Sequence, residues 1–405
     1  MAKPTIRFRG FDYEWEQRKF GEIVEKYEDP IETPTEGYTR LGIRSHAKGT
    51  FHSYVEKGKE LETAKMFRVA ADKFIVNITF GWEHAVAITD ENDAGKLVSH
   101  RFPQYSFNAG MNPNFFRYLI LDENFKHHLE LSSPGGAGRN RVLKLSDMLE
   151  YKMNFPSEAE QKKIAAYFDD LDNLITLHQR KCDETKKLKK YMLQKMFPQN
   201  GSKVPEIRFK GFTDEWEQRK LFEIALQTYG GGTPKTANEE FWKGNIPWIQ
   251  SSDLIEERLF NVKPRKYISQ EAISKSATKL VPQNSIAIVT RVGVGKLAFM
   301  PFSYATSQDF LSLSELKIEP EFAVYALYKM MQLVSNEVQG TSIKGITKDE
   351  LLAKEILIPD CEEQKKIGAY LHTLDSLITL HQHKCEELKK LKKFMLQNMF
   401  TQKNK

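Results

Sequence analysis

The 405-residue chain contains few cysteines, only Cys182, Cys361 and Cys385. So small and odd a number does not support a disulfide framework, and it is typical of proteins in a reducing compartment. The sequence also has no apolar run approaching the ~18 residues that a membrane-spanning helix requires, and its N-terminus lacks the apolar core of a signal peptide. We therefore expect a cytoplasmic protein with no membrane partner.

A strong excess of one charge is missing as well. Sixty lysines and arginines stand against 54 aspartates and glutamates, which leaves a net charge of +6. This mild excess does not by itself indicate a polyanionic partner. Hydrophobic residues make up 40% of the chain, which is enough for packed cores, and the length is too great for one ordinary core. The composition therefore predicts two or more folded domains.

Convincing catalytic motifs are also lacking. The stretch RVGVGKLAF (291–299) resembles a phosphate-binding loop, but its spacing differs and the final Ser or Thr is absent. The stretch NPNF (112–115) resembles the Asn-Pro-Pro-aromatic loop of amino-methyltransferases, but Asn114 interrupts it and no Gly-rich cofactor loop accompanies it. The acidic cluster in PDCEEQK (359–365) is nuclease-like, yet helix capping explains it better. We therefore expect a protein without catalysis of its own.

What the chain does contain is two internal repeats. The short repeat, Pro4–Ile23 and Pro205–Ile224, has 14 identities in 20 positions. The long repeat, Phe155–Phe197 and Ile358–Phe400, has 29 identities in 43 positions without a gap. Any tandem duplication leaves repeats, but drift would erode all of it together, whereas here the stretches between the repeats share little. The repeated parts therefore serve both halves alike, and the variable parts serve tasks that differ.

This order divides the chain into an N-terminal domain (1–155), a central conserved helix (156–202), a C-terminal domain (203–357) and a C-terminal conserved helix (358–405). The second short repeat joins the first helix to the second domain. By pseudo-symmetry, we expect the first short repeat to lie near the end of the second helix. Trp15 and Trp216 are the expected packing anchors of the first and second copies of the short repeat.

The long repeat predicts a pair of long helices. Ser157-x-x-Glu160 and Asp360-x-x-Glu363 fit a capping box at their starts. Acidic residues fill the first half of each helix and basic residues the second half, which favours antiparallel pairing. Apolar residues at spacings of three and four form a heptad-like seam. The expected helix-pairing residues are Ile164, Phe168, Leu171, Ile175, His178, Ile367, Leu371, Leu374, Ile378 and His381.

Polar residues interrupt this seam at His178 and Cys182, and again at His381 and Cys385. They could fix the register of the pair. Alternatively, the two His-x-x-x-Cys pairs could supply four zinc ligands. Such a site requires close convergence of the four side chains and partners around them, so we favour the register role and expect no metal site.

The variable segments mix strand-like and helical patterns. Asp72–Phe80 and Asn284–Gly293 read as buried strands, and helices are expected to open at Pro113 and Pro320. Each segment is therefore predicted to be an α+β domain with the same order of elements. Different sequences on one architecture indicate one task performed on two different targets.

Loops in both variable segments carry basic and amide side chains. Arg and Lys suit phosphates and guanine edges, and Gln and Asn suit adenine. For any single residue a solvated loop is an equal alternative, so the set is more persuasive than its members. The candidate DNA-binding residues are Arg40, Arg44, His46, Lys48, His100, Arg101, Arg139 and Arg141 in the first segment, and Gln250, Ser251, Ser252, Arg291, Lys296, Gln308, Thr341, Ser342 and Lys344 in the second.

The chain resembles the DNA specificity subunit of type I restriction–modification systems over essentially its whole length. The first variable segment departs from the family pattern because it lacks the GGTP…IPW phrase that the second contains. The residues that carry the resemblance are EWEQRK (14–19 and 215–220), EQKKI (160–164 and 363–367), KLKKYMLQKMF (187–197), KLKKFMLQNMF (390–400) and GGTPKTANEEFWKGNIPWIQSSDL (231–254).

The resemblance implies an α+β fold in which two α/β target recognition domains are separated by two long conserved helices. These helices form an antiparallel coiled coil with internal pseudo-two-fold symmetry. Each recognition domain reads one half of a bipartite, asymmetric site in double-stranded DNA. The helices set the spacing and dock two modification (methyltransferase) subunits. S-adenosylmethionine, ATP and Mg are expected in the partner subunits, including the restriction/translocase subunits, and no cofactor is expected in this chain.

Overall fold

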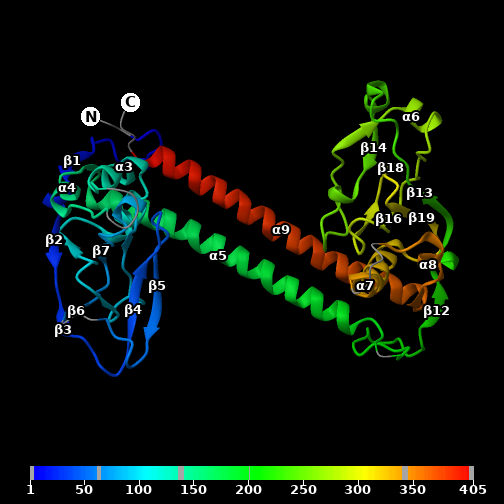
Figure 1. Cartoon of the computed structure of the whole chain (residues 1–405), viewed down its shortest axis with the longest axis horizontal. Helices are drawn as coiled ribbons and strands as arrows, with labels where there is room; N and C mark the ends of the chain where they lie inside the picture. Colours follow the sequence, from blue (N-terminus) through cyan, green and yellow to red (C-terminus); the bar gives the residue numbers. More distant parts are fainter. Residues whose placement is uncertain (1–3, 62–64, 136–140, 200, 340–344, 401–405) are drawn as a thin grey trace. The chain divides into compact units, whose positions relative to one another are not determined.

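The computed structural model describes residues 4–61, 65–135, 141–199, 201–339 and 345–400 (Figure 1). The chain forms two compact units. Unit 1 combines Met1–His178 with Lys384–Lys405, and unit 2 is Gln179–His383. Each unit therefore holds one short repeat, one variable segment and a part of each long helix.

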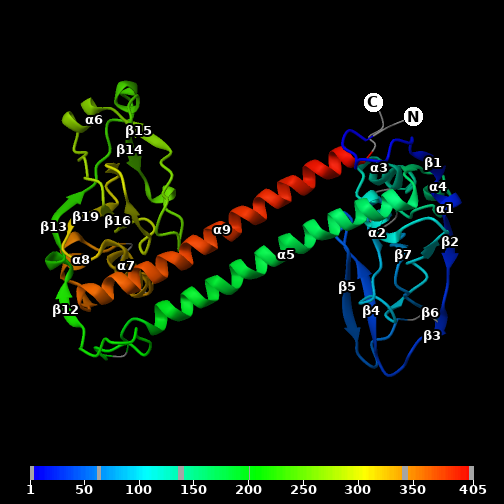
Figure 2. The same cartoon turned by 180° about the vertical axis from the view of Figure 1, so that it is seen from behind.

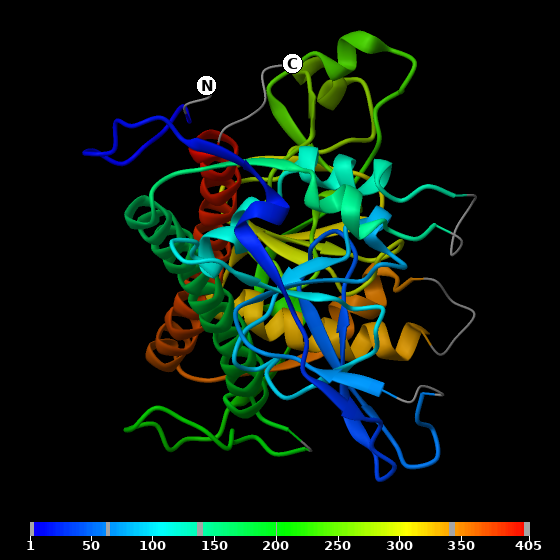
Figure 3. The ribbon, with the colours of Figure 1, turned by 90° about the vertical axis from the view of Figure 1, so that its left-hand side faces the viewer.

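Unit 1 is built on three antiparallel or mixed sheets (Figures 1 and 3). The short repeat supplies β1 (Glu16–Lys19), which pairs antiparallel with β11 (Lys152–Phe155), followed by α1 (Phe20–Ile23). A four-stranded antiparallel sheet has the order β2-β10-β7-β8, with β2 (Val24–Tyr27), β10 (Gln104–Phe107), β7 (Lys73–Val76) and β8 (Val86–Ile88). A five-stranded sheet has the order β3-β6-β9-β4-β5, with β3 (Pro30–Glu32), β6 (Lys65–Arg68), β9 (Leu97–Val98), β4 (Tyr38–Ile43) and β5 (Thr50–Val55).

The predicted strand Asp72–Phe80 forms, but it ends at Val76. Asn77 explains the early end: its Oδ1 accepts a hydrogen bond from the Thr79 amide (3.0 Å) and its carbonyl accepts one from the Phe80 amide (3.1 Å). Such a local turn competes with strand pairing. The chain therefore continues as a loop that contains the 3-10 turn η1 (Gly81–Glu83).

The helix predicted to open at Pro113 forms as two pieces, α2 (Pro113–Leu119) and α3 (Glu123–Leu131). Nε2 of the buried His84 lies 2.8 Å from the Ile120 carbonyl. Because this carbonyl is bonded outside the helix, α2 ends there and a new helix begins at Glu123. The short α4 (Leu145–Leu149) then leads into β11.

Unit 2 repeats this frame (Figures 1 and 2). Strand β12 (Glu217–Lys220) pairs with β20 (Glu355–Ile358), and η3 (Leu221–Glu223) follows β12. Its four-stranded antiparallel sheet has the order β13-β19-β16-β17, with β13 (Ala225–Gly230), β19 (Phe310–Leu316), β16 (Ser285–Val289) and β17 (Leu297–Met300). The predicted strand Asn284–Gly293 thus forms over a shorter range.

The second sheet of unit 2 has only three strands, in the order β15-β14-β18. Strand β18 runs parallel to β14, just as β9 runs parallel to β4 in unit 1. The strands of this sheet are β14 (Ile246–Ile249), β15 (Lys266–Ile268) and β18 (Ala305–Thr306). The short helices of unit 2 include η4 (Glu239–Trp242), η5 (Ser251–Asp253), α6 (Gln270–Ser274) and α8 (Lys348–Ala353).

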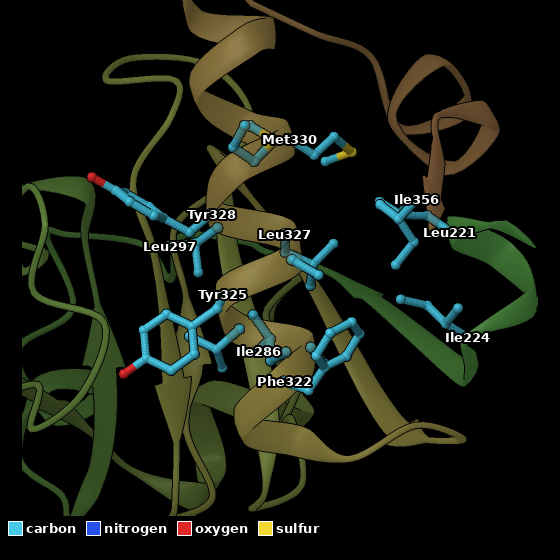
Figure 4. Packing of buried hydrophobic residues seen from close by; sticks show 14 of the residues in the cluster. Leu221, Ile224, Ile286, Leu297, Phe322, Tyr325, Leu327, Tyr328, Met330 and Ile356 are labelled. Atoms are coloured by element: carbon cyan, nitrogen blue, oxygen red, sulfur yellow. The ribbon is translucent and has the colours of Figure 1, made fainter. Parts of the chain in front are cut away.

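The main core of unit 2 surrounds α7 (Pro320–Gln339), the helix predicted to open at Pro320. Figure 4 shows Phe322 and Leu327 of α7 beside Ile224 and Ile356, while Ile286 belongs to the sheet behind the helix. These side chains are all buried. One helix therefore packs against both the sheet and the residues of the short repeat, and burial of this apolar area is the main stabilising term.

The long repeat forms α5 (Glu158–Lys195) and α9 (Cys361–Met399), which run antiparallel in each unit. In unit 2, Cys182 Sγ lies 3.9 Å from the Ile378 carbonyl, and Lys189 Nζ lies 2.6 Å from Asp375. In unit 1, Cys385 Sγ lies 3.9 Å from the Ile175 carbonyl and Lys392 Nζ lies 2.6 Å from Asp172. The expected pairing of acidic with basic halves is therefore confirmed within both units.

The predicted helix-pairing residues lie along these helices. Ile164, Phe168, Leu171, Ile367, Leu371, Leu374 and Ile378 are buried, and Ile175, His178 and His381 are half-buried.

None of the described helices is apolar enough over a sufficient length to cross a membrane.

A tyrosine of each variable segment joins the ion pair of its unit. Tyr118 Oη donates to Asp169 (2.8 Å) and Asp172 (3.1 Å), and Lys392 lies over the Tyr118 ring. In unit 2, Tyr325 Oη donates to Asp375 (2.6 Å), and Lys189 lies over the Tyr325 ring. Each Tyr–Asp–Lys triad thus ties α2 or α7 to both long helices.

The short repeat seats the end of a long helix in each unit. The Ile6 amide donates to the Asn398 carbonyl (2.9 Å), and the Ile207 amide donates to the Lys195 carbonyl (3.0 Å). The expectation that the first short repeat lies near the end of the second helix is confirmed. Trp15 and Trp216 are buried against Phe400 and Phe197, with ring centroids 6.3 and 5.7 Å apart, so their expected role as packing anchors is confirmed too.

The buried glutamate of the EQKKI motif holds this arrangement in both copies. Arg7 makes a bidentate ion pair with Glu160 (2.7 Å for both bonds), and Arg208 makes the same pair with Glu363 (2.8 Å for both bonds). The carboxylates predicted to close capping boxes therefore bind arginines of the short repeat. The cap oxygen itself is confirmed in the second copy, where Asp360 Oδ1 accepts from the Glu363 amide (3.1 Å).

Candidate nucleic-acid interface

Most of the described candidate residues of unit 1 lie on three loops. Arg44, His46 and Lys48 follow β4, and His100 and Arg101 follow β9. Arg40 lies within β4 beside Leu97 of β9. Arg141 lies between α3 and α4, whereas Arg139 falls outside the described residues.

The η1 loop that follows β7 brings these loops together. The His46 amide donates to the Glu83 carbonyl (2.8 Å). Arg101 Nη1 donates to Thr79 Oγ1 (3.3 Å), and the guanidinium of Arg141 lies 5.2 Å from the centroid of the Trp82 ring. Three basic residues that are far apart in the sequence therefore lie around one short turn. A cluster of basic residues attracts the phosphates of a nucleic acid.

His84 fixes the inner side of this turn. It adopts a left-handed conformation (φ 59°), and its ring is bonded to the Ile120 carbonyl. Burial lowers the pKa of His84 below its usual value, although the hydrogen bond to Ile120 opposes the shift. His84 is therefore a neutral structural group at neutral pH, and the exposed basic side chains nearby supply the charge.

Arg141 is partly committed to structure. Its Nε donates to the Ser133 carbonyl and its Nη2 to the Glu130 carbonyl, both at 3.1 Å. These carbonyls end α3, where a cation is favourable.

The candidate residues of unit 2 lie at the corresponding loops. Gln250 follows β14 and precedes η5, which contains Ser251 and Ser252. Arg291 and Lys296 lie between β16 and β17, and Gln308 follows β18. Thr341, Ser342 and Lys344 fall outside the described residues.

Backbone hydrogen bonds bring these loops together as well. The Ser307 amide donates to the Ile249 carbonyl (3.0 Å), beside Gln250. The Thr290 amide donates to the Asp309 carbonyl (2.8 Å), which places the start of the Arg291 loop beside Gln308. The edge of unit 2 therefore presents two amides and two cations where the edge of unit 1 presents mainly cations.

The GGTP…IPW phrase builds the floor of this edge. A Cβ on Gly231 would lie 1.7 Å from the Ser307 carbonyl oxygen, and one on Gly232 would lie 2.7 Å from the backbone of Ala277. Trp248 Nε1 donates to the Gly232 carbonyl (3.0 Å). The glycines are therefore needed for close backbone contact, and the tryptophan fixes the strand that carries Gln250.

Sequence reasoning missed several residues that organise both edges. Thr79 and Trp82 of unit 1 contact two of the candidate arginines, and Thr233 Oγ1 donates to Gln308 Oε1 (2.8 Å) in unit 2. The buried Asp253 accepts a hydrogen bond from the Gln250 amide (2.9 Å). Thr233 and Asp253 lie within the family phrase (231–254), which is the signal that marks them. Thr79 lies in a stretch whose pattern predicts a strand, and no sequence pattern marks Trp82.

The sequence pattern of the type I restriction modification DNA specificity domain matches residues 13–187 and again residues 213–390. The chain belongs to this family. Its two DNA specificity domains coincide with the two copies of the frame described above. Members of the family are DNA-recognition subunits without catalysis, and this agrees with the interpretation of the sequence.

Individual relatives agree with this assignment. A Methanocaldococcus jannaschii chain, provisionally named the MjaX specificity subunit of a type I restriction enzyme, is 23% identical and covers 96% of this chain and 93% of its own length. The specificity subunit of EcoR124I/EcoR124II from Escherichia coli is 32% identical over 42% of this chain and 43% of its own length. The fold is similar to the crystal structure of the type I restriction–modification S subunit from M. genitalium, with a TM-score of 0.61, 12% identity and coverage of 99% of this chain and 100% of that one.

The predicted register residues do not form part of a recognisable metal centre. Across the described ranges, no three His, Cys, Asp or Glu side chains gather closely enough to hold a metal ion. Cys182 and Cys385 are buried thiols that face backbone carbonyls of the opposing helix.

Proposed function

We propose that each DNA specificity domain of this chain reads one half of a bipartite, asymmetric site in double-stranded DNA. The observation that carries the proposal is the pair of matched edges: the same three loops converge in both units, but with different side chains. A protein with two identical reading edges suits a palindrome. Two different edges on one frame suit a site whose halves differ in sequence.

The chemistry of the edges supports direct reading of bases. Arginine suits guanine, and glutamine suits adenine. Arg44 and Arg101 of unit 1 and Gln250, Arg291 and Gln308 of unit 2 are the leading candidates for such contacts. The remaining candidate residues supply phosphate contacts, which set affinity and make binding steeply dependent on salt.

The long helices set the spacing of the two half-sites in this proposal. Each of them contributes residues to both units. Within each unit the helix pair is held by a partly buried Lys–Asp contact and a tyrosine of the variable segment. The helix pair is therefore a common support for the two recognition domains.

The helices also dock two modification (methyltransferase) subunits in this proposal. Large apolar side chains are exposed at equivalent positions of the long repeat, which suits two copies of one partner. S-adenosylmethionine, ATP and Mg belong to the modification and restriction/translocase subunits, and the complex works in the cytoplasm. The exposed set is Leu174, Leu391 and Phe394 in unit 1, and Leu377, Leu188 and Tyr191 in unit 2.

A segment exchange tests this function. Residues 24–155 are replaced by those of a relative, and the methylated DNA motif is determined genome-wide in cells that also carry the modification subunit. We expect one half of the motif to change completely and the other half to remain. The matched exchange of residues 225–357 should change the opposite half.

Native mass spectrometry of the purified complex should find two modification subunits per chain. A change in both half-sites after a single exchange, or a motif without two separated halves, would contradict the proposed function.

A further inference from the structure

Arg44 is held more firmly than an exposed arginine usually is. It follows the last residue of β4 and its side chain is exposed. Nη1 donates a hydrogen bond to the Thr50 carbonyl, and Cζ lies 5.3 Å from the centroid of the Phe51 ring. A hydrogen bond and a stacking contact together remove much of the rotational freedom that a free arginine has.

The Phe51 ring is itself held in place by a glycine. Gly42 of β4 lies opposite Phe51 of β5. A Cβ on Gly42 would lie 2.3 Å from the Phe51 Cζ atom, so the ring lies directly on the glycine backbone. The absence of a side chain at Gly42 therefore provides the seat for the ring that supports Arg44.

The turn that carries Arg44 is also fixed. The Arg44 amide donates to the Gly49 carbonyl (2.9 Å). His46 and Ala47 have positive φ angles (62° and 48°), and their amides donate to the Glu83 and His84 carbonyls, both at 2.8 Å. The backbone of the turn is thus anchored to the η1 loop, and the origin of the Arg44 side chain is defined.

We propose that Arg44 reads a guanine in the half-site recognised by unit 1, and that Phe51 is its positioning residue. The inference rests on the proposed function and adds the base and the residue. The contact to Thr50 uses Nη1, and within the described residues Nε and Nη2 have no protein partner. These two donors form the planar fork that matches guanine O6 and N7.

The geometry favours a base over a phosphate. A phosphate is bound adequately by a mobile cation such as Lys48, which is exposed on the same turn. A base edge requires donors in a defined plane, and the Phe51 ring and the Thr50 carbonyl define that plane for Arg44. In unit 2 the corresponding antiparallel strand pair is β14–β15, and Gln250 rather than an arginine follows β14, so this device belongs to one half-site only.

The test uses the full chain in complex with its modification subunit. The methylated motif and the binding of DNA variants at each position are measured for the native chain, Arg44→Lys, Phe51→Ala and Phe51→Tyr. Lysine retains the charge but not the fork. We expect Arg44→Lys to lower the preference for guanine at one position of the unit 1 half-site on the order of 10- to 100-fold and to leave the other half-site unchanged.

Phe51→Ala should lower the same preference by a smaller factor, and Phe51→Tyr should preserve it. Arg68→Lys is the matched control, because Arg68 lies in the same sheet and faces Asp29 (3.9 Å), and it should leave the motif unchanged.

Two results would overturn the inference while leaving the proposed function intact. One is an unchanged motif with uniformly weaker binding of all the DNA variants by Arg44→Lys, which indicates a phosphate contact. The other is an unchanged motif and unchanged affinity in Arg44→Lys. A native complex without a bipartite motif would instead overturn the proposed function.

Discussion

Units 1 and 2 agree in their frame and differ at their edges. Both have a four-stranded antiparallel sheet with matching strand order, a short repeat that seats the end of a long helix, and a Tyr–Asp–Lys triad. They differ in the second sheet, which has five strands in unit 1 and three in unit 2, and in the side chains of the converging loops. The repeated sequence therefore encodes the support, and the variable sequence encodes what the support presents.

The largest effect should be the same in both units. Glu160→Gln and Glu363→Gln each leave a mostly buried arginine without its carboxylate; the native Glu side chains are 1% and 0% exposed. The hydrogen bond to the glutamate raises the pKa of each arginine, so the guanidinium stays charged. We expect each substitution to lower the free energy of unfolding by about 3 kcal/mol.

Urea unfolding of the full chain and hydrogen exchange of β1 and β12 would measure this loss. Glu16→Gln is the control, because its pair with Arg18 is exposed and contributes little. A loss in one unit only would refute the equivalence of the two short repeats.

A second pair of substitutions should lower stability by different amounts in the two units. In unit 2, Lys189 and Asp375 are 10% and 19% exposed, whereas Lys392 and Asp172 in unit 1 are 22% and 43% exposed. Because solvent screens the more exposed pair, Asp375→Asn should cost about 2 kcal/mol and Asp172→Asn about 1 kcal/mol or less. Hydrogen exchange of α7 and α2 gives the readout, and equal losses would show that burial does not distinguish the triads.

The smallest effect should be confined to unit 1. Burial lowers the pKa of His84 in the folded chain, so the unfolded chain binds a proton more readily. The contribution of His84 to stability is therefore complete above the unfolded pKa of about 6.5 and declines as the pH falls below it. Exchange protection of α2 and α3, corrected for intrinsic rates, should fall between pH 7 and pH 5.5, while that of α7 serves as the internal reference.

His84→Gln keeps a donor for the Ile120 carbonyl but does not titrate. It should remove the pH-dependent part of the loss in unit 1. If the loss persisted unchanged in this variant, another group would be responsible.

The frame was largely predictable because its determinants are local or repeated. Heptad spacing, separated charges and two copies of the same residues were sufficient to expect paired antiparallel helices. The position of the first short repeat followed from symmetry alone, and Trp15 beside Phe400 confirms it.

Other features depend on contacts that no local pattern records. The break between α2 and α3 arises because His84 bonds the carbonyl of Ile120. The carboxylates of Glu160 and Glu363 fit a capping box in sequence, but distant arginines bind them. The loops after β4 and β9 meet because these strands are neighbours in one sheet, and hydrogen bonds join them to the loop after β7, which belongs to another sheet. Sequence spacing reveals neither relation. The candidate loops could thus be chosen from the sequence, but their meeting point could not.

Unit 1 is formed from two separate segments of the chain, and this has a consequence for folding during synthesis. Its core includes Met399, and Phe400 stacks against Phe168 and faces Trp15. The ribosome makes these residues after all of unit 2, so the first unit to emerge is the last that can close. Until then its aromatic surface lies open, in a chain whose second unit already has every residue it needs. A chain truncated late in translation would therefore expose its defect in the portion made earliest, where a chaperone or protease can recognise it.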